Sequence, residues 1–164
     1  AFGIQSRDGG AITDIEVDGL RIDTRLQGPT CWGSAEPVHI SARARLEGDR
    51  PGRVDDVRIS DVRGRAEGAV IVVGEAPGDI GTVVLRDIDV ELVVGRGVMA
   101  GTVDLRPPVN PLARGGTGMD NAYRMDKDRG LPWGVERIPG WPVGVLLRTA
   151  GHVVQDDVRV TRVD

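Results

Sequence analysis

A short phrase of alternating apolar and polar residues recurs along the chain. Full copies begin at Ile12, Val54 and Ile80, and a degenerate copy begins at Val158. In each full copy the apolar residues occupy relative positions 1, 4, 6 and 9. The middle pair alternates as a β-strand does, and the outer two lie beyond a kink or bulge. Such repetition in one small chain predicts stacked coils of short strands.

The spacing of the copies supports this prediction. Val57 and Val83 lie 26 residues apart, and Val83 and Val158 lie 75 apart, close to three such steps. Ile15 and Val57 lie 42 residues apart, which allows one step and an insertion. A coil of about that length is typical of a parallel β-helix. Helices are not expected, because no long segment has helical periodicity and 24 Gly and 10 Pro interrupt the chain.

The pattern predicts a single all-β domain over the 164 residues. We expect regular coils over about 1–105, a long irregular loop over about 106–142 and closing strands over about 143–164. The middle segment is too long for an ordinary connection, so it is either a functional loop or poorly ordered. The chain begins at Ala1 and enters a strand almost directly, so we expect a β-helix truncated at its N-terminal end.

Composition and charge exclude some classes of function. The net charge is −4 with acids and bases interspersed, which argues against a nucleic-acid partner. Lys127 is the only lysine among 21 basic residues, so the arginines either cover a solvated surface or recognise carboxylates through their planar fork. Cys31 is the only cysteine, which excludes an internal disulfide. No transmembrane run or signal peptide is present, so no membrane partner is expected.

Three segments carry a resemblance to a known family. Residues 31–41 read Cys-Trp-Gly-Ser-Ala-Glu-Pro-Val-His-Ile-Ser and look like a Trp-Gly-x-x-Glu-Pro-aliphatic-x-Ile segment of bacterial members. Residues 67–74 look like the strand of the next coil, and 101–107 resemble a Gly-x-x-Asp-x-Arg-Pro stretch. The family is glycoside hydrolase family 28, the polygalacturonases and rhamnogalacturonan hydrolases. The resemblance covers about 2–106 and extends more loosely to the end of the chain.

The resemblance implies a right-handed parallel β-helix of the pectin-lyase-like type that hydrolyses pectin-type polysaccharides with inversion. One carboxylic acid protonates the leaving oxygen, and a carboxylate base activates water on the opposite face of the sugar. The family takes these groups from Asn-Thr-Asp and Gly-Asp-Asp motifs, followed by Gly-His-Gly. All three would precede Ala1, so we expect missing N-terminal coils to supply them and this chain alone to be inactive. The resemblance also implies a secreted or periplasmic protein.

The resemblance further implies which residues line a cleft for a polysaccharide or oligosaccharide. The carboxylate-gripping Arg-Ile-Lys of the family falls at residues 3–5, which read Gly-Ile-Gln. This replacement argues against strict galacturonate recognition there, although Gln5 or Arg7 can still hydrogen-bond a sugar. One coil further, Glu36 stands where polygalacturonases have a substrate-contacting tyrosine. The predicted substrate-binding residues are Gln5, Arg7, Trp32, Glu36 and His39.

Two of these residues have structural interpretations as well. Trp32 lies on a Gly-flanked loop, where it is either a lid over the hydrophobic end of a coil or a platform for a sugar ring. His39 lies between the inward residues Val38 and Ile40, so it projects outward beside Glu36. It is therefore either an ordinary surface histidine or a residue of the cleft.

Other charged residues fit structural roles. Asp55-Asp56 and Asp156-Asp157 each precede a strand, where Asp commonly bonds backbone amides in a turn. His152 lacks the second glycine of the family's histidine motif, so we expect a turn or surface residue. Asp104 and Arg106 are expected to pair with each other. No His, Cys and Asp cluster has metal-ligand spacing, so neither a metal nor a cofactor is expected.

Two functions other than hydrolysis stay open. The chain is alternatively a noncatalytic β-helix that binds carbohydrate or serves as a structural module. A pectate lyase-type β-helix is a third interpretation. Such lyases use a Ca²⁺ site of clustered carboxylates with a basic residue as the base, and the sequence contains no such cluster.

Overall fold

The computed structural model describes residues 1–29, 31–45, 48–106, 125–140 and 144–163. All regular secondary structure in these ranges is β-strand, which confirms the predicted all-β class. None of the described segments is a helix long and apolar enough to cross a membrane.

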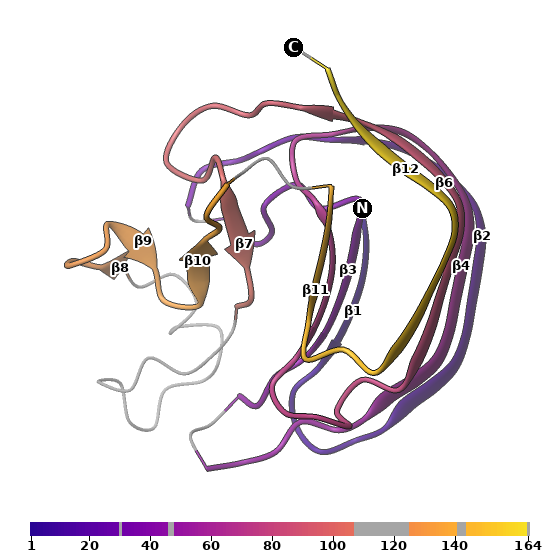
Figure 1. Cartoon of the computed structure of the whole chain (residues 1–164). Helices are drawn as coiled ribbons and strands as arrows, with labels where there is room; N and C mark the ends of the chain where they lie inside the picture. The colour runs from indigo at the N-terminus through magenta and orange to yellow at the C-terminus, as the bar shows by residue number, and fades with distance from the viewer. Residues whose placement is uncertain (30, 46–47, 107–124, 141–143, 164) are drawn as a thin grey trace.

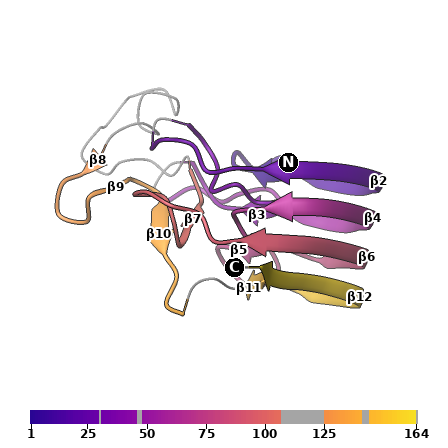
Figure 2. The same ribbon diagram turned by 90° about the horizontal axis from the view of Figure 1, so that it is seen from above.

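Two four-stranded parallel sheets organise the chain (Figure 1). Sheet A consists, in order, of β1 (Phe2–Ser6), β3 (Val38–Ala42), β5 (Val70–Gly74) and β11 (Val145–Arg148). Sheet B consists, in the same direction, of β2 (Ile12–Thr24), β4 (Val54–Ala66), β6 (Thr82–Val93) and β12 (His152–Val163). Each pair β1–β2, β3–β4, β5–β6 and β11–β12 adds one strand to both sheets, and we call these pairs layers 1 to 4. Figure 2 shows the strands of sheet B stacked as rungs.

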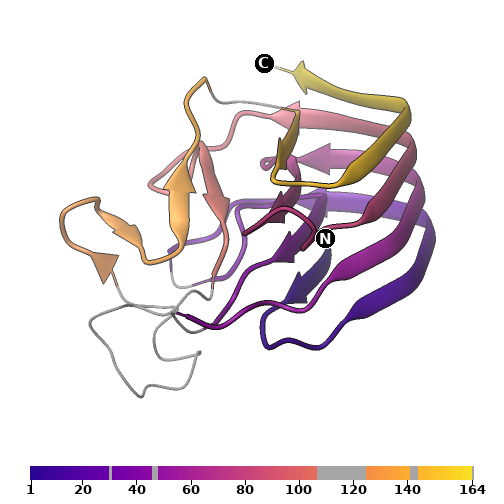
Figure 3. The ribbon, with the colours of Figure 1, turned by 60° about the horizontal axis from the view of Figure 1, so that its bottom comes forward.

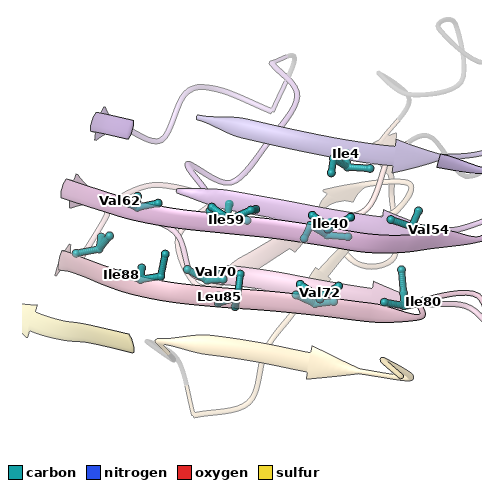
Figure 4. Close-up of a cluster of buried hydrophobic side chains, with 14 of the residues drawn as sticks. Ile4, Ile40, Val54, Ile59, Val62, Val70, Val72, Ile80, Leu85 and Ile88 are labelled. Atoms are coloured by element: carbon teal, nitrogen blue, oxygen red, sulfur yellow. The ribbon is translucent and has the colours of Figure 1, made fainter. Parts of the chain in front are cut away.

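Inward-facing aliphatic rows from both sheets fill the space between them (Figure 4). The rows run in register from layer to layer, as in Ile4–Ile40–Val72 of sheet A and Val17–Ile59–Leu85 of sheet B. Each fully buried aliphatic side chain stabilises the fold by about 1.5–3 kcal/mol, so these rows supply most of the driving force. The inward orientation predicted for Val38 and Ile40 is confirmed.

Left-handed residues bend the long strands of sheet B at matching positions. One residue per layer has a φ between 49° and 79° and is skipped by the backbone ladder: Gly19, Asp61, Asp87 and Asp157. A second row of this kind contains Asp14 and Asp56, with φ of 63° and 49°. These bends confirm the kinks predicted between the inner and outer apolar positions of the repeat. Aspartate suits them because its short polar side chain tolerates the left-handed region.

The last copy of the repeat has a different register from the predicted one. Val158 pairs with Ile88, and Val153 is the residue that pairs with Val83. Alternation alone fits both registers, but the bend at Asp157 must stack on the bend of β6. Layers 3 and 4 are therefore neighbours, and the long spacing is one insertion rather than additional coils.

The insertion contains two short antiparallel pairs. In one, β7 (Thr102–Asp104) pairs with β10 (Val135–Arg137), and in the other, β8 (Met125–Asp126) pairs with β9 (Leu131–Pro132).

Part of this insertion lies against the face of sheet A that is turned away from sheet B (Figures 1 and 3). We call its described residues, 95–106 and 125–140, the cover. Val103 and Leu105 of the cover pack with Ile71 and Val73 of β5. This contact buries the outward side of β5, so that every residue of this strand is buried. The rest of the predicted loop, 107–124 and 141–142, lies outside the described residues.

The bend at Asp87 provides a test of this architecture. Replacement by valine should destabilise the protein by about 1–2 kcal/mol, because a β-branched residue is strained at a φ of 51°. Replacement by asparagine, which tolerates that region, should change the free energy of unfolding by less than about 0.5 kcal/mol. Urea denaturation of both variants measures the difference. Equal losses would contradict a left-handed bend at this residue.

Candidate functional site

The outward face of sheet A changes from apolar to polar toward layer 1. Two outward rows show the change, Ile71–His39–Gly3 and Val73–Ser41–Gln5. The apolar members lie beneath the cover in layer 3, whereas the polar members lie in layers 1 and 2. The parallel register therefore brings together polar side chains that are more than thirty residues apart in the sequence.

Gln5 and His39 are linked directly across the β1–β3 ladder. Arg7 Nη2 donates to Gln5 Oε1 at 3.0 Å, so the Gln5 amide nitrogen is turned toward His39, 3.3 Å from its Nε2. A donor facing Nε2 requires that this nitrogen accept, which places the proton of a neutral His39 on Nδ1. His39 Nδ1 lies 3.9 Å from Glu36 Oε1, and Ser41 Oγ lies 2.9 Å from Nε2. The imidazole is thus held from both sides.

Glu36 organises the loop that carries Trp32. Its Oε2 accepts a hydrogen bond from the Ser34 amide at 2.7 Å, and its Oε1 accepts one from the Asp104 amide at 3.4 Å. The Gly33 amide donates to Asp104 Oδ2 at 2.5 Å. These bonds tie the residues that follow Trp32 to β7. The Trp32 side chain itself remains 41% exposed.

Asp104 and Arg106 form a buried ion pair beneath the same loop. Arg106 Nη2 lies 2.6 Å from Asp104 Oδ2, and both residues are almost inaccessible to solvent. Arg106 also donates to the carbonyl oxygens of Pro29 and Cys31. The pairing predicted from the sequence is confirmed. Its role is wider than expected, because it attaches the 29–36 loop to the cover.

Arg7 is a buried cation whose described hydrogen bonds all go to neutral acceptors. It donates to the carbonyl oxygens of Arg106 at 2.6 Å and Arg43 at 3.4 Å, besides the bond to Gln5. No carboxylate of the described residues forms an ion pair with it, and its Nε has no acceptor among them. Burial, followed by the charge of Arg43, lowers the pKa of Arg7 to about 10. An anion beside it would be stabilised by this buried positive charge, which forms no ion pair among the described residues.

The structure therefore joins the five predicted site residues. Gln5, Arg7, His39 and Glu36 form one contiguous polar group, and Trp32 is attached to it through its neighbouring amides. His39 projects outward from sheet A, as expected, but it is not a surface histidine, because it is buried with a 6% exposed fraction. Only Gln5 and Trp32 of the five present exposed side chains.

Two members of the site, Ser41 and Arg43, were not predicted. The sequence does contain a signal for them, because Ile4-Gln-Ser-Arg7 and Ile40-Ser-Ala-Arg43 have the same spacing. Ile4 and Ile40 are register partners, so the residues that follow them stack as well. Aligning the short strands of sheet A, in addition to the longer repeat of sheet B, would have placed both residues on the outward face.

Asp55-Asp56 and Asp156-Asp157 lie inside β4 and β12, so the prediction that they occupy turns before a strand is wrong. The predicted bonding to backbone amides is seen for Asp55. Asp55 accepts backbone hydrogen bonds from Thr82 at 2.7 Å and Asp56 at 2.9 Å, and it pairs with Arg53. The bonds from Thr82 and Asp56, with a further contribution from Arg53, lower the pKa of Asp55. In the part of the chain that the structure describes, no three His, Cys, Asp or Glu side chains gather as a metal site requires.

No known family model matches the chain, and neither a curated protein nor a solved structure shows significant similarity to it. A function must therefore be argued from the geometry of the polar group itself.

The buried Asp104–Arg106 pair can be tested by removing its carboxylate. Asp104→Ala should destabilise the protein by about 3 kcal/mol, because the Arg106 guanidinium stays buried without its carboxylate partner. Asp156→Ala is the matched control, since it removes an exposed carboxylate that pairs with Arg86 and should cost less than about 1 kcal/mol. Urea denaturation followed by circular dichroism measures both changes. Losses of equal size would show that the pair does not anchor the loop.

Proposed function

We propose that this chain is the C-terminal part of a right-handed parallel β-helix of the pectin-lyase-like type. In this proposal it belongs to a glycoside hydrolase that cleaves the O-glycosidic bonds of pectin-type polysaccharides with inversion, and preceding coils supply the catalytic carboxylates. The alternation of successive strands between two parallel sheets supports the fold, because stacked coils of a β-helix have this topology. The sequence segments that resemble glycoside hydrolase family 28 support the activity.

The observation that carries the proposal is the polar group at the free edge of sheet A. β1 is an edge strand of that sheet among the described residues. The group of Gln5, Arg7 and His39 lies on the outward face of sheet A, at β1 and the neighbouring β3. Amide and guanidinium groups are suited to sugar hydroxyls, and a guanidinium is suited to a carboxylate. An acidic sugar would supply the anion that Arg7 lacks among the described residues.

Exposure divides the five residues into two roles. Gln5 and Trp32 are exposed, so they are the side chains that contact the sugar in this proposal. Trp32 offers an aromatic face with a polar edge, which suits the apolar face of a pyranose ring. Arg7, Glu36 and His39 are buried, and they position the other two. Closer approach of a carboxylate to Arg7 requires the cover to shift, because the Arg106 carbonyl oxygen occupies its Nη2.

The acids of this group are poor candidates for the catalytic pair. Inversion needs one protonated carboxyl and one free carboxylate on opposite sides of the glycosidic bond. Glu36 is bound by backbone amides, and Asp104 is held by Arg106. Neither arrangement favours proton donation to a sugar. The proposal therefore keeps the chemistry on preceding coils and assigns substrate binding to this chain.

A noncatalytic carbohydrate-binding β-helix is the second candidate. The backbone hydrogen bond to Glu36 and the ion pair of Asp104 favour this candidate, since these contacts leave neither acid available for catalysis. The coding sequence upstream of Ala1 separates the two functions. An open frame with Gly-Asp-Asp and Gly-His-Gly at coil-sized spacing supports the hydrolase. A start codon or unrelated sequence there supports the binding module.

Binding by Gln5 and Trp32 can be measured on the chain itself. Gln5→Ala and Trp32→Ala should each weaken the binding of an oligogalacturonate by about tenfold, through a lost hydrogen bond and a lost stacking surface. Trp133→Ala is the matched control, because its indole contacts Arg129 of the cover and should leave affinity unchanged. Isothermal titration calorimetry provides the dissociation constants. Unchanged affinity in both site variants would rule out this binding surface.

Catalysis by the isolated chain is the second test. Incubation with polygalacturonate should release no new reducing ends, because the catalytic pair is placed upstream. The proposal would be wrong if the chain cleaved the polymer and Asp55→Asn abolished the cleavage. In that case the aspartate that accepts the Thr82 amide would be a catalytic residue instead of a structural one.

A further inference from the structure

A second cluster of charges lies on the outward face of sheet A, in layers 2 and 4. Arg43 directly follows β3, Arg148 ends β11, and Glu136 belongs to β10 of the cover. Glu136 Oε1 accepts a hydrogen bond from Arg43 at 3.2 Å, and its Oε2 accepts one from Arg148 at 2.7 Å. Two arginines presented by sheet A therefore converge on a single carboxylate of the cover.

Cavities flank this carboxylate on two sides. One has a volume of about 210 Å³ and is bordered by Arg43, Glu75 and Thr149. The other has a volume of about 150 Å³ and is bordered by Val103, Ile138 and Leu146. Glu136 and Arg148 line both cavities. The Glu136–Arg148 ion pair thus borders both cavities, one with charged neighbours and one with apolar neighbours.

We propose that Arg43 and Arg148 form a binding site for the carboxylate of an acidic sugar, and that Glu136 occupies this site as an internal substitute. This inference rests on the proposed function for its ligand class. The paired arginines match the two oxygens of one carboxylate, as they do for Glu136. The adjoining apolar wall of Val103, Ile138 and Leu146 suits the apolar face of a sugar ring.

Displacement of Glu136 does not require the cover to unfold. Its neighbour Val135 is fully buried, and β10 is held to β7 by backbone hydrogen bonds. Further backbone bonds join Leu105 to Gly134 and Ile138 to Gly101. Rotation of the Glu136 side chain is therefore enough to vacate the two arginines. The side chains of this cluster are between 24% and 42% exposed, so solvent and ligands reach them directly.

The site is continuous with the polar group at layer 1. The Arg43 amide donates to the Ser6 carbonyl oxygen, which continues the β1–β3 register past the strand ends. Arg7 and Arg43 therefore stack in neighbouring layers, and strands of neighbouring layers lie about 4.8 Å apart. Arg43 thus lies one layer away from Arg7 and faces the same side of sheet A.

The experiment compares acidic and neutral ligands on the chain and on Glu136→Gln. The probes are trigalacturonate and neutral galactotriose, measured by isothermal titration calorimetry. Glu136→Gln should bind trigalacturonate about fivefold more tightly than the unmodified chain, because a competing and repelling carboxylate is gone. Adding Arg148→Gln should abolish the gain. Glu91→Gln is the matched control, since it removes an exposed carboxylate that pairs with Arg65 on sheet B.

The outcomes separate this inference from the proposed function. Equal affinity of Glu136→Gln and the unmodified chain for trigalacturonate would overturn the inference and leave saccharide binding intact. An equal gain for galactotriose would overturn it too, because no carboxylate would be recognised. A gain for free galacturonate without binding of either trisaccharide would support the carboxylate site and count against the proposed function. Inhibition of that gain by equimolar sulfate would overturn the assignment to a sugar acid.

Discussion

Backbone ladders join each layer of this chain to the neighbouring layer, and the parallel register constrains all other features. One bend recurs at the same position in all four layers, which keeps the inward rows in contact. The stacked left-handed residues from Gly19 to Asp157 are one result. Gly64 is another, because a Cβ there would lie 2.0 Å from the Ile22 carbonyl oxygen in the neighbouring layer.

The same register creates the candidate site. Parallel stacking aligns the ends of β1 and β3, so that Gln5 meets His39 although the two are 34 residues apart. It also places the outward positions of β5 beside them, and these are apolar because Val103 and Leu105 cover them. A single outward face is consequently polar in layers 1 and 2 and apolar in layer 3. The boundary between the two parts is where the cover meets the polar group.

The repeat predicted the inward rows and the kinks because both are local and recur in the sequence. It failed for the last layer, since Val153 and Val158 fit the alternation equally well and only the stacking of Asp157 on Asp87 distinguishes the registers. The sequence pattern did not predict the burial of His39 either. Gln5, Glu36 and Ser41 surround the imidazole, and Glu36 lies in a loop outside the repeat.

The burial of charge distinguishes the structural part of this face from the part suited to a ligand. The Asp104–Arg106 pair is buried and fully matched, so breaking it would expose each partner to a large desolvation cost. Arg43 and Arg148 hold Glu136 in a partly exposed pair, where solvent screening makes exchange of the carboxylate cheap. Arg7 is buried with only neutral acceptors among the described residues, a state that an added anion would stabilise. Arg106 is therefore required by the fold, whereas Arg43 and Arg148 can exchange Glu136 for the carboxylate of the proposed ligand.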